Sequence, residues 1–140
     1  MPRARIIRLA IGALAAMAVS ACGIIKSDPA SDWQTPKLAS GFTNAGAGAA
    51  PVGYYKDASD RVYLRGVVQS TQASPSDAKV FVLDEGVRPV YTHRFNVLFS
   101  LHEGDIVIWA AVQVSPDGVV SVSGANIETF SLDQVSFRTR

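Results

Sequence analysis

The sequence predicts an all-β protein: an antiparallel β-sandwich, jelly-roll-like, behind an N-terminal helical leader. From residue 33 onward, apolar and polar residues alternate with the period of two that a half-buried strand requires, and no segment repeats with the period of a helix. The alternating runs are short and turn-forming residues separate them, which is the spacing of sandwiches and barrels. A content of 48% hydrophobic and 18% charged residues is typical of a chain that folds.

The N-terminal residues have the composition of an export leader. No acidic residue precedes Asp28, and three arginines, Arg3, Arg5 and Arg8, come before an uncharged apolar run over residues 9–19. A positive start followed by a short apolar run is the layout of a secretory signal. Its eleven residues would span only about 16 Å as a helix, whereas the hydrocarbon core of a bilayer is about 30 Å thick. We therefore predict a leader rather than a permanent membrane span.

The single cysteine lies just after this apolar run, in the order Val19-Ser20-Ala21-Cys22-Gly23. This order resembles the lipobox of bacterial lipoproteins, in which an aliphatic residue and two small residues precede the cysteine. The resemblance implies signal-peptide cleavage between Ala21 and Cys22, with a lipidated Cys22 as the new N-terminus. Two or three acyl chains would anchor it stably in the membrane. The alternative is a helix that happens to bury a thiol, since a lone cysteine is often a small core residue.

The chain thus divides into three predicted parts. Residues 1–21 are a lipoprotein signal peptide, residues 22–32 a flexible tether, and residues 33–140 the β-sandwich domain. The net charge of +1 is spread unevenly over these parts, because residues 1–21 contain three arginines and no acidic residue. The mature chain keeps 10 basic and 12 acidic residues, a net charge of −2. Such a chain is not suited to bind nucleic acid by neutralising phosphates.

Within the domain, two long runs are clear strand candidates. Arg61–Gln69 places Val62, Leu64, Gly66 and Val68 on one face, and His93–Leu101 places Phe95, Val97, Phe99 and Leu101 on one face. We interpret each run as one strand. The glycine- and alanine-rich segment Gly41–Gly53 is expected to be an ordered loop crossing the sandwich, because no Lys-Ser or Lys-Thr pair follows it to make a phosphate-binding loop.

The most apolar stretch, Asp105–Val114, is expected to form a hairpin with Val119–Ser123. The intervening Ser115-Pro116-Asp117-Gly118 provides a proline that presets φ and a glycine that can adopt a positive φ. Because the stretch is apolar on both faces, it is either central in the sandwich or covered by a neighbouring subunit, and we expect Trp109 to be buried at such an interface. Shorter strands are predicted at Lys79–Leu83, Ile127–Leu132 and Val135–Arg138.

The residue inventory argues against an enzyme. One cysteine allows neither an internal disulfide nor a multi-cysteine zinc site, and His93 and His102 have no neighbours at metal-ligand spacing. Two carboxylate pairs occur, Asp57 with Asp60 and Glu103 with Asp105, but both flank turns, where carboxylates usually cap the backbone in solvent. We therefore expect no catalytic residues, no metal and no cofactor.

Seven short motifs follow one another along the domain. They are Trp33…Leu38, Gly41-Phe42-Thr43-Asn44, Tyr54…Lys56-Asp57, Arg61-Val62-Tyr63-Leu64-Arg65-Gly66, Gly86-Val87-Arg88-Pro89, Ser131-Leu132-Asp133 and Val135-Ser136-Phe137-Arg138. This series resembles the C-terminal, receptor-binding-type domain of tail-fibre and minor tail proteins of double-stranded DNA phages that infect Gram-positive bacteria. The resemblance covers residues 33–138 and implies a compact β-sandwich, often trimeric, that recognises glycans of the host surface without catalytic residues.

The sequence departs from that family's pattern at three places. Asp84-Glu85 stands where the family has a Leu-Pro-like pair, and Phe42 replaces the usual tryptophan. Upstream, the lipobox stands where a fibre shaft or a virion-attachment segment would be expected. A virion component has no evident use for a lipid anchor, so the module is interpreted as recruited to a cell-surface lipoprotein, with a prophage as one origin.

Aromatic side chains are the remaining candidates for ligand contact, because they can stack on sugar rings or on a protein partner. The alternative for each is packing in the core or at a subunit interface. The candidates are Trp33, Tyr54, Tyr55, Tyr63, Tyr91 and Trp109.

Together these observations predict a lipid-anchored, extracytoplasmic binding module at the cell membrane. The resemblance implies a homotrimeric head, which would recognise carbohydrate or another envelope component. One alternative is a virion tail protein whose N-terminus only mimics a signal peptide, and another is an envelope lipoprotein with a purely structural role.

Overall fold

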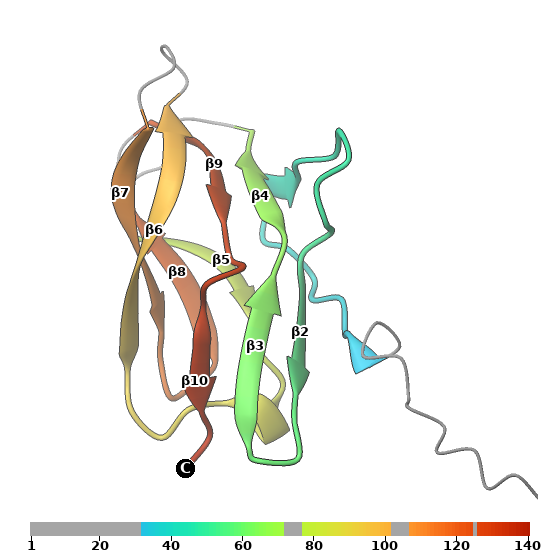
Figure 1. Ribbon diagram of the computed structural model, residues 1–140. Helices are drawn as coiled ribbons and strands as arrows, with labels where there is room; N and C mark the ends of the chain where they lie inside the picture. Colours follow the sequence, from blue (N-terminus) through green and yellow to red (C-terminus); the bar gives the residue numbers. More distant parts are fainter. Residues whose placement is uncertain (1–31, 72–76, 102–106, 125) are drawn as a thin grey trace, which may run out of the picture.

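The computed structural model describes residues 32–71, 77–101, 107–124 and 126–140, which form ten antiparallel strands in two sheets (Figure 1). The expectation of an all-β antiparallel sandwich is confirmed. The strands are β1 (Phe42–Asn44), β2 (Gly53–Lys56), β3 (Arg61–Arg65), β4 (Val67–Ser70), β5 (Ala78–Val82), β6 (His93–Leu101), β7 (Val107–Val114), β8 (Val119–Ser123), β9 (Ile127–Ser131) and β10 (Ser136–Arg138), with a short 3-10 turn, η2 (Glu85–Val87), between β5 and β6.

The larger sheet has seven strands in the order β1-β4-β9-β6-β7-β8-β5, and the smaller has three in the order β10-β3-β2. Every pairing is antiparallel. β1 and β5 are the two edges of the large sheet, and β2 and β10 are those of the small one.

Strands β6, β7 and β8 confirm the sequence analysis. β6 spans the predicted residues, with Val97 and Phe99 buried while Arg94 and Asn96 are exposed. The turn between β7 and β8 is closed by the Gly118 amide, which donates to the Ser115 carbonyl at 2.9 Å. Gly118 has a φ of +86°, the left-handed conformation that its turn position requires.

The interpretation of Arg61–Gln69 as one strand is wrong. The chain changes sheets at Gly66, so that β3 belongs to the small sheet and β4 to the large one. Gly66 has a φ of +99°, and a Cβ atom there would lie 2.6 Å from the carbonyl carbon and oxygen of Pro51. The alternation of buried and partly buried residues nevertheless continues through the break, because both strands face the same core.

A second chain segment changes sheets beside the first. Figure 1 shows β3 leading into β4 while β9 runs in the opposite direction into β10. The Gly66 amide donates to Asp133 Oδ1 at 2.8 Å, and the Leu132 amide donates to the Gly66 carbonyl at 2.9 Å. The Ser131 hydroxyl donates to Asp133 Oδ2 at 2.9 Å, which orients the carboxylate. We call these four residues the crossing clasp.

The predicted loop Gly41–Gly53 contains a strand that the sequence analysis missed. Residues 42–44 form β1 at the edge of the large sheet, and Gly53 begins β2 of the small sheet. Asn44 Oδ1 accepts a hydrogen bond of 2.7 Å from the Val52 amide and so ties the two ends of the remaining loop together. The strand has only three residues, Phe42, Thr43 and Asn44, which is too few for an alternating apolar signal to stand out.

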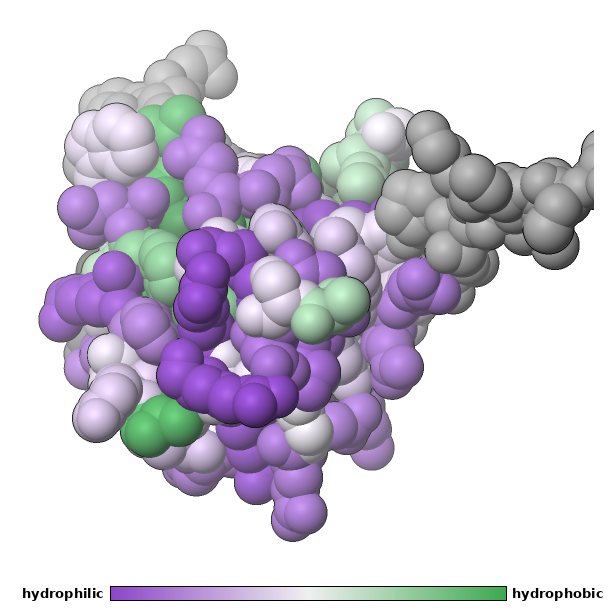
Figure 2. Space-filling model, turned by 60° about the horizontal axis from the view of Figure 1, so that its bottom comes forward, coloured by the Kyte–Doolittle hydropathy of each residue, from purple (hydrophilic) through white to green (hydrophobic). Residues whose placement is uncertain are grey.

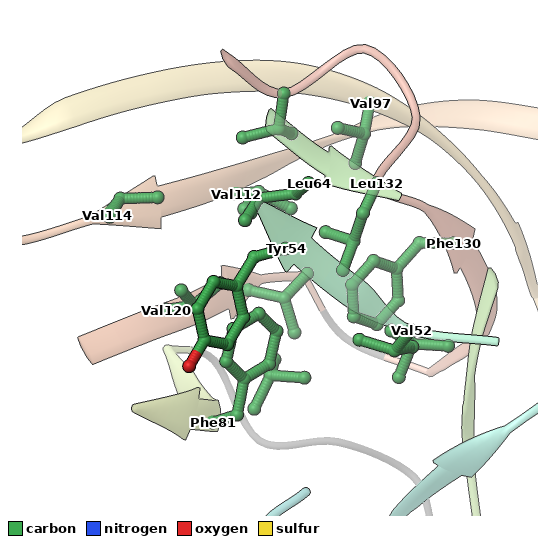
Figure 3. Close-up of a cluster of buried hydrophobic side chains, with 14 of the residues drawn as sticks. Val52, Tyr54, Leu64, Phe81, Val97, Val112, Val114, Val120, Phe130 and Leu132 are labelled. Atoms are coloured by element: carbon green, nitrogen blue, oxygen red, sulfur yellow. The ribbon is translucent and has the colours of Figure 1, made fainter. Parts of the chain in front are cut away.

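The core lies between the two sheets and is apolar (Figure 3). Its largest fully buried side chains come from both sheets and from the connections between them. A bulge in β5 turns two consecutive residues, Val80 and Phe81, toward this core. Burying each large apolar side chain contributes about 1.5–3 kcal/mol, so the core is the main source of stability. The largest are Phe81, Phe130, Leu64, Leu83, Ile127 and Leu132.

Candidate ligand groove

A surface groove of about 920 Å³ lies along β2, an edge of the small sheet. Its other walls are the chain at residues 32–37, the end of β5 and the turn η2. The groove therefore occupies the seam where the edge of one sheet approaches the edge of the other. Its lining residues are Asp32, Trp33, Gln34, Thr35, Pro36, Lys37, Tyr54, Tyr55, Lys56, Val82, Asp84, Gly86 and Val87.

Residues 34–39 form a strap that connects the two sheet edges. Gln34 and Tyr54 exchange backbone hydrogen bonds of 2.8 and 3.0 Å, which ties the strap to β2. The Ala39 amide donates to the Val80 carbonyl at 2.7 Å, which ties it to β5. The strap is held at both ends, so its middle forms a defined wall of the groove.

Tyr54 and Asp84 form a hydrogen-bonded polar pair in the lining of the groove, the tyrosine buried and the carboxylate exposed. The Tyr54 ring is only 4% exposed and lies among the core side chains, with its hydroxyl oxygen directed outward (Figure 3). This hydroxyl donates to Asp84 Oδ2 at 2.5 Å. Burial, followed by the hydrogen bond to Asp84 and the charge of that carboxylate, raises the pKa of Tyr54 to about 12. The pair connects the core to the turn before η2.

The alkaline titration of Tyr54 is the first expected result. A pKa raised from 10.0 to about 12 means that Tyr54 contributes stability in full below pH 10 and loses it as the pH rises from 10 to 12. We expect a step near pH 12 in the tyrosinate absorbance of the folded protein, and Tyr54→Phe should lower its amplitude by the contribution of one tyrosine. Tyr91→Phe is the control, because Tyr91 is 75% exposed. The pKa of Tyr63 is also raised, by burial and by its hydrogen bond to Asp57, so part of the high-pH absorbance change stays in Tyr54→Phe. A change of undiminished amplitude in this variant would refute the assignment.

An aromatic row continues from the groove over the outer face of the small sheet. The Trp33 and Tyr55 rings meet edge to face with centroids 4.8 Å apart, and Tyr55 stacks on Tyr63 at 5.1 Å. The Arg65 guanidinium lies 4.2 Å from the centroid of the Trp33 ring, above Gly53, where a Cβ atom would meet that ring at 3.5 Å. The three rings are half-buried and hold one another in place.

The turn between β2 and β3 fixes the far end of this row. Asp57 Oδ1 accepts hydrogen bonds from the Ser59 hydroxyl and from the Ser59 and Arg61 amides at 2.7, 2.8 and 3.0 Å. The first of these bonds, together with those from the backbone, lowers the pKa of Asp57 below its ordinary value. The Tyr63 hydroxyl donates to Asp57 Oδ2 at 3.2 Å. Asp57 therefore acts as a turn cap, as the sequence analysis expected.

Acidic and basic side chains balance in the groove. Two carboxylates, Asp32 and Asp84, and two ammonium groups, Lys37 and Lys56, are among its lining residues. Lys56 Nζ donates to the Gly86 carbonyl at 2.9 Å and lies 3.6 Å from Asp60 Oδ1. Its charge is therefore largely engaged in holding η2 and the β2–β3 turn. The end of the molecule that carries this turn and the C-terminus is mostly hydrophilic (Figure 2).

The six aromatic candidates separate into three groups. Trp33, Tyr55 and Tyr63 form the aromatic row. Tyr54 takes the alternative considered for each candidate, because its ring belongs to the core. Tyr91 is 75% and Trp109 63% exposed, away from the groove lining. Trp109 is thus not covered within this chain, and burial against another subunit stays a prediction.

Other residues named from the sequence take structural positions or are not described. His93 stacks on Phe95 and Phe137 at 6.1 and 5.7 Å. His102, Ala21 and Cys22 lie outside the described residues. Sequence reasoning did not select Asp84 as a ligand contact. Its only signal was the departure from the Leu-Pro-like pair expected there.

Within the described ranges, no three histidine, cysteine or carboxylate side chains come together at a spacing that would hold a metal ion. The same part of the chain contains no helix long and apolar enough to cross a membrane.

Comparison with known proteins identifies the fold. No protein-family model and no curated protein matches the sequence. Among solved structures, the receptor binding protein of Listeria phage PSA superposes with a TM-score of 0.57 at 16% identity, over 77% of this chain and 64% of that one. The head domain of lactococcal phage bIL170 gives a TM-score of 0.56 at 18% identity, over 76% of this chain and 96% of that one. This chain therefore has the fold of phage receptor-binding head domains, as the motif series indicated.

Proposed function

We propose that this chain is a lipid-anchored cell-surface binding module whose head recognises carbohydrate or another component of the cell envelope. The single observation that carries the proposal is the fold, which the chain shares with two phage proteins that are described as receptor-binding. A groove beside a pre-ordered aromatic row is the kind of surface such a module needs. The mechanism is binding alone, with no chemical step.

Attachment to the membrane is the second half of the proposal. It rests on the order Val19-Ser20-Ala21-Cys22 behind an arginine-rich start and a short apolar run. The signal peptide would be removed after Ala21, and the acylated Cys22 would hold the head at the surface through the tether at residues 22–32. The groove includes Asp32 and Trp33, so the ligand site would lie next to the point where this tether enters the domain.

Binding of the full chain to immobilised envelope polysaccharides tests the proposed recognition of an envelope component. The detergent-solubilised protein should bind at least one polysaccharide fraction, and binding should be lost when the protein is unfolded beforehand. A blank result on polysaccharides and in a pull-down from whole envelopes would count against the function.

A virion tail protein is the second candidate, and the same fold supports it. Mass spectrometry of the native N-terminus distinguishes the lipoprotein from the virion tail protein. Loss of residues 1–21 with added lipid mass supports the lipoprotein, whereas a chain that still begins with its leader supports the virion protein.

The exposed face of β6 and β7 leads to a prediction about self-association. Leu98 and Trp109 are cross-strand neighbours and are 47% and 63% exposed. If the head forms a homotrimer through this face, Trp109→Ser should convert the protein to monomer in light scattering after gel filtration. Tyr91→Ser, at another exposed aromatic residue, should leave the mass unchanged. A wild-type protein that is already monomeric would contradict the prediction.

A further inference from the structure

We propose that the groove between β2, the strap and η2 binds a neutral saccharide, and that Asp84 is the group that accepts hydrogen bonds from its hydroxyls. This inference rests on the proposed binding function and adds to it the site, the charge class of the ligand and the residue that determines specificity. Three features of the groove carry it: a fixed acceptor, a pre-ordered aromatic wall and a balance of charge.

Asp84 provides the fixed acceptor. An ionised carboxylate only accepts hydrogen bonds and has about four lone-pair sites, and the Tyr54 hydroxyl occupies one of them at Oδ2. Tyr54 is buried and keeps its proton up to about pH 12, so it orients Asp84 over the physiological range. Of the two carboxylate oxygens of Asp84, only Oδ2 accepts a side-chain hydrogen bond from the described residues, which leaves Oδ1 for ligand donors, and adjacent sugar hydroxyls are donors that suit a single carboxylate.

Trp33 and Tyr55 provide the aromatic wall. Sugar rings present apolar C–H faces that pack on aromatic side chains, and both residues line the groove. Arg65 holds Trp33, and Tyr63 holds Tyr55, so these rings are ordered before a ligand arrives. A pre-ordered site loses little side-chain entropy on binding, which favours affinity for a small ligand.

The balance of charge selects the class of saccharide. The two carboxylates and two ammonium groups of the lining cancel, and Lys56 is already engaged with Gly86 and Asp60. A phosphorylated polymer would gain no net attraction there and would meet the Asp84 carboxylate, whereas a neutral sugar pays no such penalty. Gln34 and Thr35 add uncharged polar groups on the strap side.

Substitution of Asp84 tests the proposal on an array of neutral, N-acetylated and phosphorylated hexose oligosaccharides. The full chain should bind neutral members, and binding should vary little with salt concentration. Asp84→Ala should weaken this binding about 10- to 100-fold, the value of one or two hydrogen bonds to a charged group. Asp84→Asn keeps an acceptor for Tyr54 and so protects the fold, and it should also weaken binding.

Glu85→Ala is the matched control, because Glu85 is the next carboxylate along the chain and is exposed outside the groove lining. It should bind as the wild type does. Wild-type binding that survives both Asp84 substitutions would overturn the groove assignment and leave the binding function standing. Binding confined to the phosphorylated members would overturn the neutral class. A wild type that binds no saccharide at all would overturn the inference together with the carbohydrate-binding function.

Discussion

Gly66→Ala is expected to destabilise the domain by about 2–5 kcal/mol, a large share of the 5–15 kcal/mol typical of a domain. The left-handed backbone at φ +99° costs a residue with a Cβ atom about 1–2 kcal/mol. The new methyl group would also lie 2.6 Å from the Pro51 carbonyl, and such overpacking costs about 1–3 kcal/mol because backbone must move. Urea denaturation followed by tryptophan fluorescence measures the loss as a lower midpoint.

Substitutions at two other glycines distinguish the cost of the left-handed backbone from the cost of the steric contact. Gly46 has a φ of +68° with nothing within 4 Å of its Cβ position, so Gly46→Ala should cost only the strain of about 1–2 kcal/mol. Gly86 has neither a left-handed φ nor a close neighbour, and Gly86→Ala should stay within about 0.5 kcal/mol of wild type. If Gly66→Ala were no worse than Gly46→Ala, the steric role of the sheet crossing would be wrong.

The same glycine shows what the sequence could and could not predict. The alternation from Arg61 to Gln69 gives the correct inward residues, because both sheets face one core and the period of two is local. It does not reveal the change of sheet, which depends on pairing with β9 and β10 sixty or more residues later. β1 was missed for a related reason, since an edge strand of three residues carries too little alternation to stand out.

The motif series predicted the fold well and the groove poorly. Residues of the Leu-Arg-Gly and Ser-Leu-Asp motifs form the crossing clasp, so these motifs record how the sheets are joined rather than which ligand is bound. The groove instead combines the strap, β2 and the turn at Asp84, which are far apart in sequence and meet only because two sheet edges approach each other. Trp33 and Tyr55 were named as ligand candidates from their residue type, although Trp33 also begins the motif series, and Asp84 belongs to none of the motifs.

Cys22→Ser is expected to abolish lipid attachment and cleavage after Ala21. A serine hydroxyl is a far weaker nucleophile than a thiol, so no acyl chain would be added at this position. Mass spectrometry of the purified variant should find residues 1–21 retained and no lipid mass, where the wild type shows the reverse. Ser20→Ala is the matched control, because it keeps a small residue in the lipobox-like order and should be processed normally.

The charge of the mature chain bears on how the protein is held at the membrane. After removal of residues 1–21 the chain has 10 basic and 12 acidic residues, so an anionic membrane surface does not attract it. The apolar run at residues 9–19 would span only about 16 Å as a helix and cannot replace the anchor as a stable membrane span. Acyl chains on Cys22 would then hold the wild type to the membrane. Because the variant keeps residues 1–21 with their three arginines, its retained leader and missing lipid mass, rather than its sedimentation alone, report the loss of this anchor. A Cys22→Ser protein that is processed normally and still sediments with membranes would refute the lipid anchor and favour the virion alternative.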